Sequence, residues 1–148
     1  MSIAFIGLQI FVVLFLALHD WVPLGRLNDV RAVQSADSRG KLVTVTALST
    51  LPFAICLAGS LYFARTRYPG WLVWTLWLGY GALAFGAFRA WWLPYLFVDE
   101  PVRAARYQKM FGRTHAFLPE RHGIRPNTLH IVLHLAIAAV LILLARLT

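Results

Sequence analysis

The sequence predicts an all-α integral membrane protein, a four-transmembrane-helix bundle with a short amphipathic interfacial helix in its third connection. Its 148 residues are 59% hydrophobic and only 14% charged, whereas soluble domains carry about a quarter charged residues. Four stretches contain no charged side chain, at 1–18, 42–64, 68–88 and 126–145. The basic residues gather between these stretches. A chain of this length suits one domain, so we expect residues 1–148 to form a single membrane unit.

The apolar stretches have the length of membrane crossings. A helix rises 1.5 Å per residue, so about 20 residues cross the ~30 Å hydrocarbon layer. The last three stretches reach that length and the first nearly does. The first also lacks the basic start and small-residue cleavage site of a signal peptide, so we expect a retained helix. The predicted transmembrane helices are about 2–19, 42–64, 70–95 and 127–146, with cytoplasmic loops at 20–41 and 96–126.

The distribution of basic residues predicts the orientation. Three basic residues, Arg65, Arg67 and Arg146, fall on one side of the predicted membrane. Ten fall in or beside the two long loops: Arg26, Arg31, Arg39, Lys41, Arg103, Arg106, Lys109, Arg113, Arg121 and Arg125. Because short basic loops stay cytoplasmic, both termini are expected on the non-cytoplasmic side, as in a bacterial inner-membrane protein. The net charge of +8 is then a topology signal that favours the lipid bilayer and anionic lipid head groups as partners, and not nucleic acid.

The third connection predicts local order. Asp99, Glu100 and Pro101 are typical of a helix start and Gly112 of a helix end, so a short amphipathic helix is expected at 101–111, along the inner membrane surface. The apolar residues Phe117, Leu118 and Ile124 indicate that the rest of this loop folds back onto the bundle. Asn127 or Thr128 is expected to cap the last helix.

Small and polar residues inside the spans predict helix contacts. Gly79, Ala82, Gly86 and Ala90 form a small-residue face that favours close helix packing, and a second copy could use such a face to form a homo-oligomer. Gln9, deep in the first span, is expected to hydrogen-bond to a neighbouring helix. Cys56 is the only cysteine, so no intrachain disulfide can form.

Ionisable residues map to the cytoplasmic end of the predicted bundle. His130 and His134 are one turn apart and share a helix face, and Arg89 lies at a similar depth in the third span. His19 and Asp20 end the first span, while the large loop adds His115 and Glu120. Ionisable side chains inside a membrane indicate a functional site. These residues are therefore the candidate site, with His130, His134 and Arg89 as candidate catalytic groups and His19, Asp20, His115 and Glu120 as candidate ligand-binding groups.

Three interpretations of the histidine pair remain open. The pair can be structural, bonding across helices. It can bind a transition metal or a haem through His130 and His134, with other site residues completing the ligand set. It can also handle protons or orient a ligand in a polar cavity. Arg89 either reaches lipid phosphate or points into the bundle toward Asp20 or an anionic or quinone-like ligand.

Two functions follow from the sequence. The first is a membrane protein with a ligand or cofactor site at the cytoplasmic end, extending to an enzyme that acts on a lipid-soluble or amphipathic substrate. The alternative is a non-catalytic membrane subunit or scaffold whose His and Arg residues form a structural polar network. The distinguishing feature is enclosed space, because a binding site needs a cavity with convergent polar groups, whereas a network bonds those groups to one another.

Overall fold

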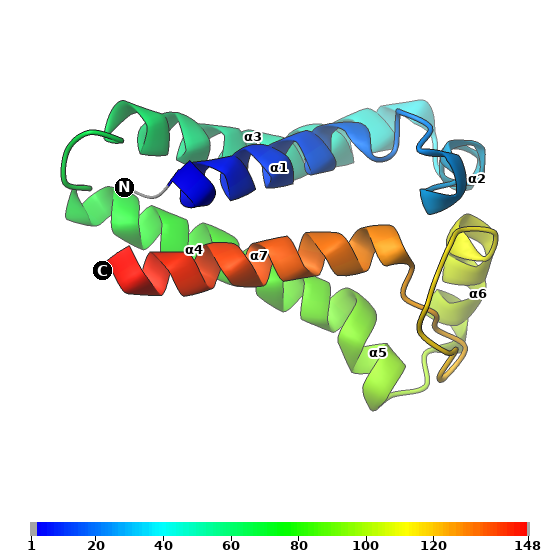
Figure 1. The fold of residues 1–148 in the computed structure, drawn as a ribbon. Helices are drawn as coiled ribbons and strands as arrows, with labels where there is room; N and C mark the ends of the chain where they lie inside the picture. The colour runs from blue at the N-terminus through cyan, green and yellow to red at the C-terminus, as the bar shows by residue number, and fades with distance from the viewer. Residues whose placement is uncertain (1–2, 148) are drawn as a thin grey trace.

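Helices lying side by side make up the bundle in the computed structural model, which describes residues 3–147 (Figure 1). The long helices are α1 (Ile3–Leu18), α3 (Arg39–Tyr62), α4 (Gly70–Ala87) and α7 (Thr128–Leu147). The helical chain of α4 continues through the π-helix η2 (Phe88–Trp92) into α5 (Leu93–Leu96). Both ends of the described chain lie at one end of the bundle, which we call the turn end. The other end, the loop end, carries the short helices α2 (Val30–Ala36) and α6 (Pro101–Phe111).

Helix length separates the four expected spans into two groups. Among residues 3–147, three helical segments are long and apolar enough to cross a membrane: Arg39–Tyr62, Gly70–Leu96 and Thr128–Arg146. The first segment, Ile3–Leu18, is apolar but has only 16 residues. The structure thus shows an all-helical bundle with three candidate spans, and α1 falls short of the expected fourth.

The core lies where α1 and α4 both meet α7. α1 packs against α3 and α7, and α4 packs against α7 and α3. Phe5, Leu76 and Val140 are fully buried in this core. Gln9 is also fully buried and donates from Nε2 to Ser60 Oγ of α3 at 3.0 Å. The predicted interhelical bond of Gln9 is therefore confirmed.

The helices α3 and α4 are close at the turn end and separate toward the loop end (Figure 1). At Gly59 a Cβ atom would lie 2.9 Å from Leu72 Cδ1, so any larger residue would require the Leu72 side chain to shift. Further along, Phe53 and Tyr80 meet with ring centroids 5.2 Å apart. A Cβ on Gly86 would meet nothing within 4 Å in the described structure. The small-residue face of α4 is therefore not a continuous packing face, because Gly86 faces open space, although Ala90 packs beside Trp91.

The π-helix arises next to a proline. Pro94 has no N–H group, so the Ala90 carbonyl lacks the donor that an α-helix would supply, and the proline ring disfavours normal helical geometry there. Two side chains of α6 bond to this carbonyl instead: Arg103 Nη1 at 3.1 Å and Tyr107 Oη at 3.1 Å. π-helical turns are often found at functional sites. This turn holds α6 against the end of the α4 segment.

The loop end contains more structure than the sequence pattern predicted. The helix at Pro101–Phe111 is confirmed, and so is the folding back of the following loop, since Ile124 is fully buried against Trp91 and Tyr95. Trp91 and Tyr95 are themselves buried in this second small core. The two-turn helix α2, capped by the Asp29 carboxylate at Ala32 N, lies within the expected loop 20–41.

Candidate functional site

A cavity of about 320 Å³ lies between the long helices on the loop-end side. Its apolar walls come mainly from the α4 segment and α7, and Val45, Ala82 and Gly86 on its rim are exposed. The cavity therefore opens sideways, through the gap between α3 and α4. Six of the residues that line it are polar: His19, Asp20, Thr46, Ser49, His130 and His134. Four of them are among the candidate residues from the sequence.

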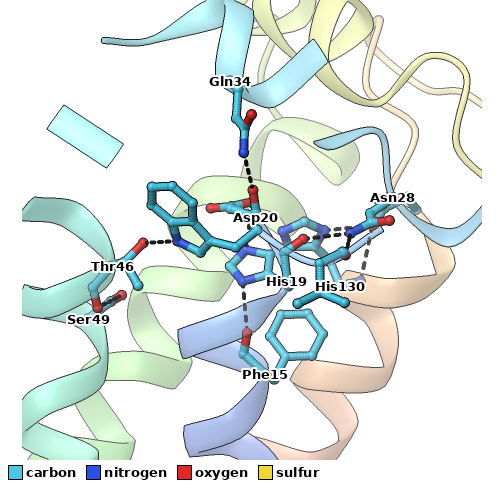
Figure 2. Close-up of polar contacts among 11 residues, drawn as sticks. Phe15, His19, Asp20, Asn28, Gln34, Thr46, Ser49 and His130 are labelled. Carbon is cyan, nitrogen blue, oxygen red and sulfur yellow. Dashed lines mark hydrogen bonds and ion pairs between the residues drawn. The ribbon is translucent and has the colours of Figure 1, made fainter. Parts of the chain in front are cut away.

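His19 and Asp20 form a pair that needs one shared proton. His19 Nδ1 lies 2.9 Å from the Phe15 carbonyl oxygen, which can only accept, so Nδ1 carries a hydrogen. His19 Nε2 lies 3.2 Å from the Asp20 carboxylate. Two bare acceptors would repel each other at that distance, so one proton resides on Nε2 or on Asp20. Figure 2 shows His19 between the Phe15 carbonyl and Asp20.

Burial affects this pair. Removal from water raises the pKa of the Asp20 carboxyl, and the neighbouring His19 partly opposes the rise. Two arrangements then compete. In one, the proton is on the Asp20 carboxyl and both groups are neutral; in the other, it is on His19 Nε2 and both groups are charged. In either arrangement, the pair carries one mobile proton at the edge of the cavity.

His130 is held in a defined tautomer. The backbone N–H of His130 donates to Asn127 Oδ1 at 3.0 Å, which identifies that atom as the amide oxygen. His130 Nδ1 lies 2.6 Å from the same oxygen and must donate to it. The other ring nitrogen, Nε2, is therefore an acceptor in the neutral ring. Aromatic rings fix the imidazole plane, with the Trp91 centroid at 4.6 Å and the His19 centroid at 5.7 Å.

His134 is held in the opposite tautomer. Trp92 Nε1 donates to His134 Nδ1 at 3.1 Å. An indole N–H can only donate, so Nδ1 is the acceptor and the hydrogen of the neutral ring is on Nε2. The two ring centroids of the histidine pair are 6.3 Å apart. The cavity is thus lined by one imidazole whose remaining nitrogen accepts and by another whose remaining nitrogen donates.

Trp21 separates this cavity from a second one. Its Nε1 donates to Thr46 Oγ1 at 3.0 Å (Figure 2 shows this bond at Thr46). Thr46 lines the 320 Å³ cavity, while Trp21 lines a neighbouring cavity of about 390 Å³ with Gln34, Arg39 and Leu42. Gln34 reaches the Asp20 carbonyl at 3.4 Å from that side. The Asp20–Trp21 segment therefore contacts residues that line each of the two cavities.

The other sequence-predicted residues lie elsewhere. Arg89 is half exposed and pairs with Glu100 at 2.7 Å, so the expectation that it points into the bundle toward Asp20 was wrong. Glu100, at the start of α6, supplies the anionic partner that this expectation placed at Asp20. His115 bonds to Thr128 Oγ1 at 2.7 Å and joins the loop to the start of α7. Glu120 is exposed and does not line the cavity.

Metal binding by the histidine pair remains a hypothesis. Within the described part of the chain, no group of three or more His, Cys, Asp or Glu side chains is arranged to hold a metal ion. The ring nitrogens that remain for a ligand are Nε2 of His130 and Nε2 of His134. A metal or haem at this pair would need further ligands from outside the protein or a rearrangement of His19 and Asp20.

Several site residues were not singled out from the sequence. Trp92 and Asn127 set the two tautomers, and Trp91 covers His130. Tryptophans at a helix end are typical of membrane interfaces, so their pattern did not indicate a site. Asn127 gave a partial signal as the expected cap of α7, and its bond to His130 N confirms that cap. Comparison of the chain with protein-family models, curated proteins and solved structures found no match.

Proposed function

We propose that the protein spans the membrane and binds a lipid-soluble molecule in the 320 Å³ cavity, with the polar head of the ligand at His130, His134 and the His19–Asp20 pair. The observation that supports this most is the coincidence of convergent polar groups with open space. A binding site needs such a coincidence. A purely structural network would bring the same groups together and leave no cavity.

The proposal includes four spans with both termini on the non-cytoplasmic side of a bacterial-type inner membrane. α1 supports this because it packs between α3 and α7, although its 16 residues extend only about 24 Å at 1.5 Å per residue. Short spans can be accommodated by local thinning of the bilayer. The ten basic residues of the loop end, against three at the turn end, support a cytoplasmic loop end.

The shape of the cavity favours an amphipathic ligand of modest size. Its opening between α3 and α4 faces the acyl chains in the proposed orientation, so a ligand can enter sideways from the bilayer. Apolar side chains such as Leu83, Leu133 and Ile137 line the path for a tail. At the inner end, a hydroxyl can donate to His130 Nε2 and a carbonyl can accept from His134 Nε2. A quinone presents such carbonyls, and its hydroquinone form presents such hydroxyls.

The same residues can exchange a proton with the bound head group. His130 Nε2 can take a proton from a hydroxyl, and the proton shared by His19 and Asp20 can be returned to an oxygen of the ligand. This is the chemistry by which the site would act as an enzyme on a lipid-soluble substrate. The non-catalytic subunit is the second candidate, and one observation favours it: three histidines already bond to protein groups through Nδ1.

The test fills the cavity without disturbing the fold. Gly86→Leu places a side chain in the open space, because a Cβ at Gly86 meets no atom within 4 Å among the described residues. Gly81→Leu is the matched control, since Gly81 is on the same helix, has the same free space and does not line the cavity. The native protein and the two variants are purified in mild detergent and titrated with a decyl-substituted benzoquinone. Quenching of tryptophan fluorescence reports binding.

Saturable quenching in the native protein and in Gly81→Leu, and its loss in Gly86→Leu, would support the proposal. Organic extracts of the same preparations are analysed by mass spectrometry for a compound that only Gly86→Leu lacks. Such a compound would identify a different lipid-soluble ligand if the quinone does not bind. Equal results for all three proteins in both assays would exclude a ligand in this cavity and favour the subunit.

A further inference from the structure

A second, separate depression lies outside the bundle between α2 and α6. It is an open cleft of about 760 Å³. The α2 side provides Asp29, Arg31, Ala32 and Ser35, and the α6 side provides Gln108, Lys109 and Arg113. Neither histidine of the α7 pair nor any other residue of the 320 Å³ cavity lines it. It is therefore a site independent of the proposed function.

The cleft carries an excess of positive charge. Arg31, Lys109 and Arg113 contribute three positive charges and Asp29 one negative charge, which leaves +2. Asp29 is also engaged as the cap of α2, where its carboxylate accepts from Ala32 N at 3.0 Å. Across residues 3–147, none of the three cations is within 4 Å of a carboxylate. Like charges that converge on one depression repel each other until an anion enters.

Other basic residues of the same helix have acidic partners. Arg103 pairs with Glu100 at 2.8 Å, and Arg106 pairs with Asp37. Asp37 also accepts from Lys41 at 2.5 Å, so this single carboxylate joins the end of α2 to the start of α3 and to α6. The Asp37 ion pairs thereby fix α2 and α6, the two walls of the cleft, relative to each other. The basic residues in the first half of α6 are thus paired with carboxylates. Lys109, in its second half, has no such partner among the described residues and lines the cleft with Arg31.

We propose that this cleft binds a phosphate group, with Arg31, Lys109 and Arg113 as its ligands. Guanidinium groups bind phosphate oxygens through two parallel N–H bonds, and lysine adds a point charge. Gln108 can add a neutral donor, whereas the Ser35 hydroxyl already donates to the Ala32 carbonyl at 2.9 Å. The phosphate has two sources at this end of the bundle, an anionic lipid head group or a soluble phosphate compound. The first source would give the expected anionic lipid partner of the basic loops a defined position.

The experiment compares two variants with equal loss of charge. Lys109→Gln/Arg113→Gln removes two cations of the cleft. Arg26→Gln/Arg39→Gln removes two exposed cations of the same end that do not line the cleft. Delipidated protein in neutral detergent is titrated with phosphatidylglycerol and followed by native mass spectrometry. Inorganic pyrophosphate is titrated separately by calorimetry. Circular dichroism verifies that both variants are folded.

We expect the cleft variant to weaken phosphate binding by about tenfold, and the control variant by less than about twofold. Loss with phosphatidylglycerol alone would identify the lipid as the source, and loss with pyrophosphate alone would identify a soluble compound. Added salt should weaken either interaction. Equal weakening in the two variants, or none in either, would overturn the proposal, because binding would then follow total charge or be absent.

Discussion

The two ends of the bundle treat buried polar groups in different ways. At the turn end, the side chains of Gln9 and Ser60 are fully buried and bond to each other, with Ser60 Oγ donating back to Gln9 Oε1 at 3.1 Å. At the loop end, His130 and His134 each use one ring nitrogen in a protein bond and line open space. Buried polar groups must find partners. Where the partners available in the fold do not use every donor and acceptor, the remainder is available to a ligand.

The connections explain why the ends differ. The turn between α3 and α4 is short, and the close approach of Gly59 to Leu72 brings the two helices together there. At the loop end the α4 segment passes through the π-helix, and the long third connection packs Ile124 against Trp91. This packing holds the inner end of the α4 segment beside α7 and away from α3. Space remains between α3 and α4 as a result.

The largest expected effect comes from His130→Phe, which removes an unused hydrogen-bond acceptor from the loop end and so makes that end more like the turn end. The phenyl ring keeps the aromatic packing around Trp91 but removes the acceptor at Nε2. We expect affinity for a decyl-substituted hydroquinone to fall by about 10- to 100-fold, because a site built to bond a hydroxyl loses that bond. The loss is measured by tryptophan quenching. An unchanged affinity would show that the cavity does not use His130, and His130→Gln should recover part of the affinity as the conservative variant.

The second effect is on stability, at the turn end. Gln9→Leu leaves Ser60 Oγ buried without its side-chain partner, and should lower the free energy of unfolding by about 1 kcal/mol. The double variant Gln9→Leu/Ser60→Ala should recover most of that loss, because both polar groups are then absent. Thermal unfolding in detergent measures both values. Neither variant should alter hydroquinone affinity, and a change there would contradict the separation of the two ends.

The sequence predicted the positions of the helices well and the orientation of their side chains less well. Apolar stretches and cap residues located α6 and the start of α7, because these signals are local. Arg89 was misplaced because its acidic partner, Glu100, is brought to it by the packing of the third connection, which no local signal in the sequence indicates. The gathering of His19, Asp20, His130 and His134 was predicted from depth alone. The cavity between them was not, because it depends on the separation of α3 and α4.

Trp92→Phe tests whether the tautomer of His134 at the loop end contributes to ligand binding. The change removes the N–H that bonds to His134 Nδ1 and so removes the preference for a hydrogen on Nε2. Hydroquinone and quinone affinity should fall by about threefold to fivefold, less than for a lost ligand. Nitrogen NMR of the labelled imidazole should show a mixture of tautomers in the variant and one tautomer in the native protein. A single tautomer in both would mean that Trp92 does not set it.

The smallest effect concerns the Asp37 carboxylate, which joins α2, α3 and α6 outside the cavity. Hydrogen bonds from Lys41 and Arg106 hold the pKa of this carboxyl below its usual 3.8. The ionised form is favoured in the folded state, so its stabilising effect is present above pH 3.8 and is lost as the pH falls through the lower folded value. At neutral pH, Asp37→Asn should lower the unfolding midpoint by only about 1–2 °C, because the partners are exposed. The difference between native protein and variant should shrink steadily as the pH is lowered below 3.8. A difference that does not change with pH would show that Asp37 acts through its shape and not through its charge, and the walls of the α2–α6 cleft would then need another support.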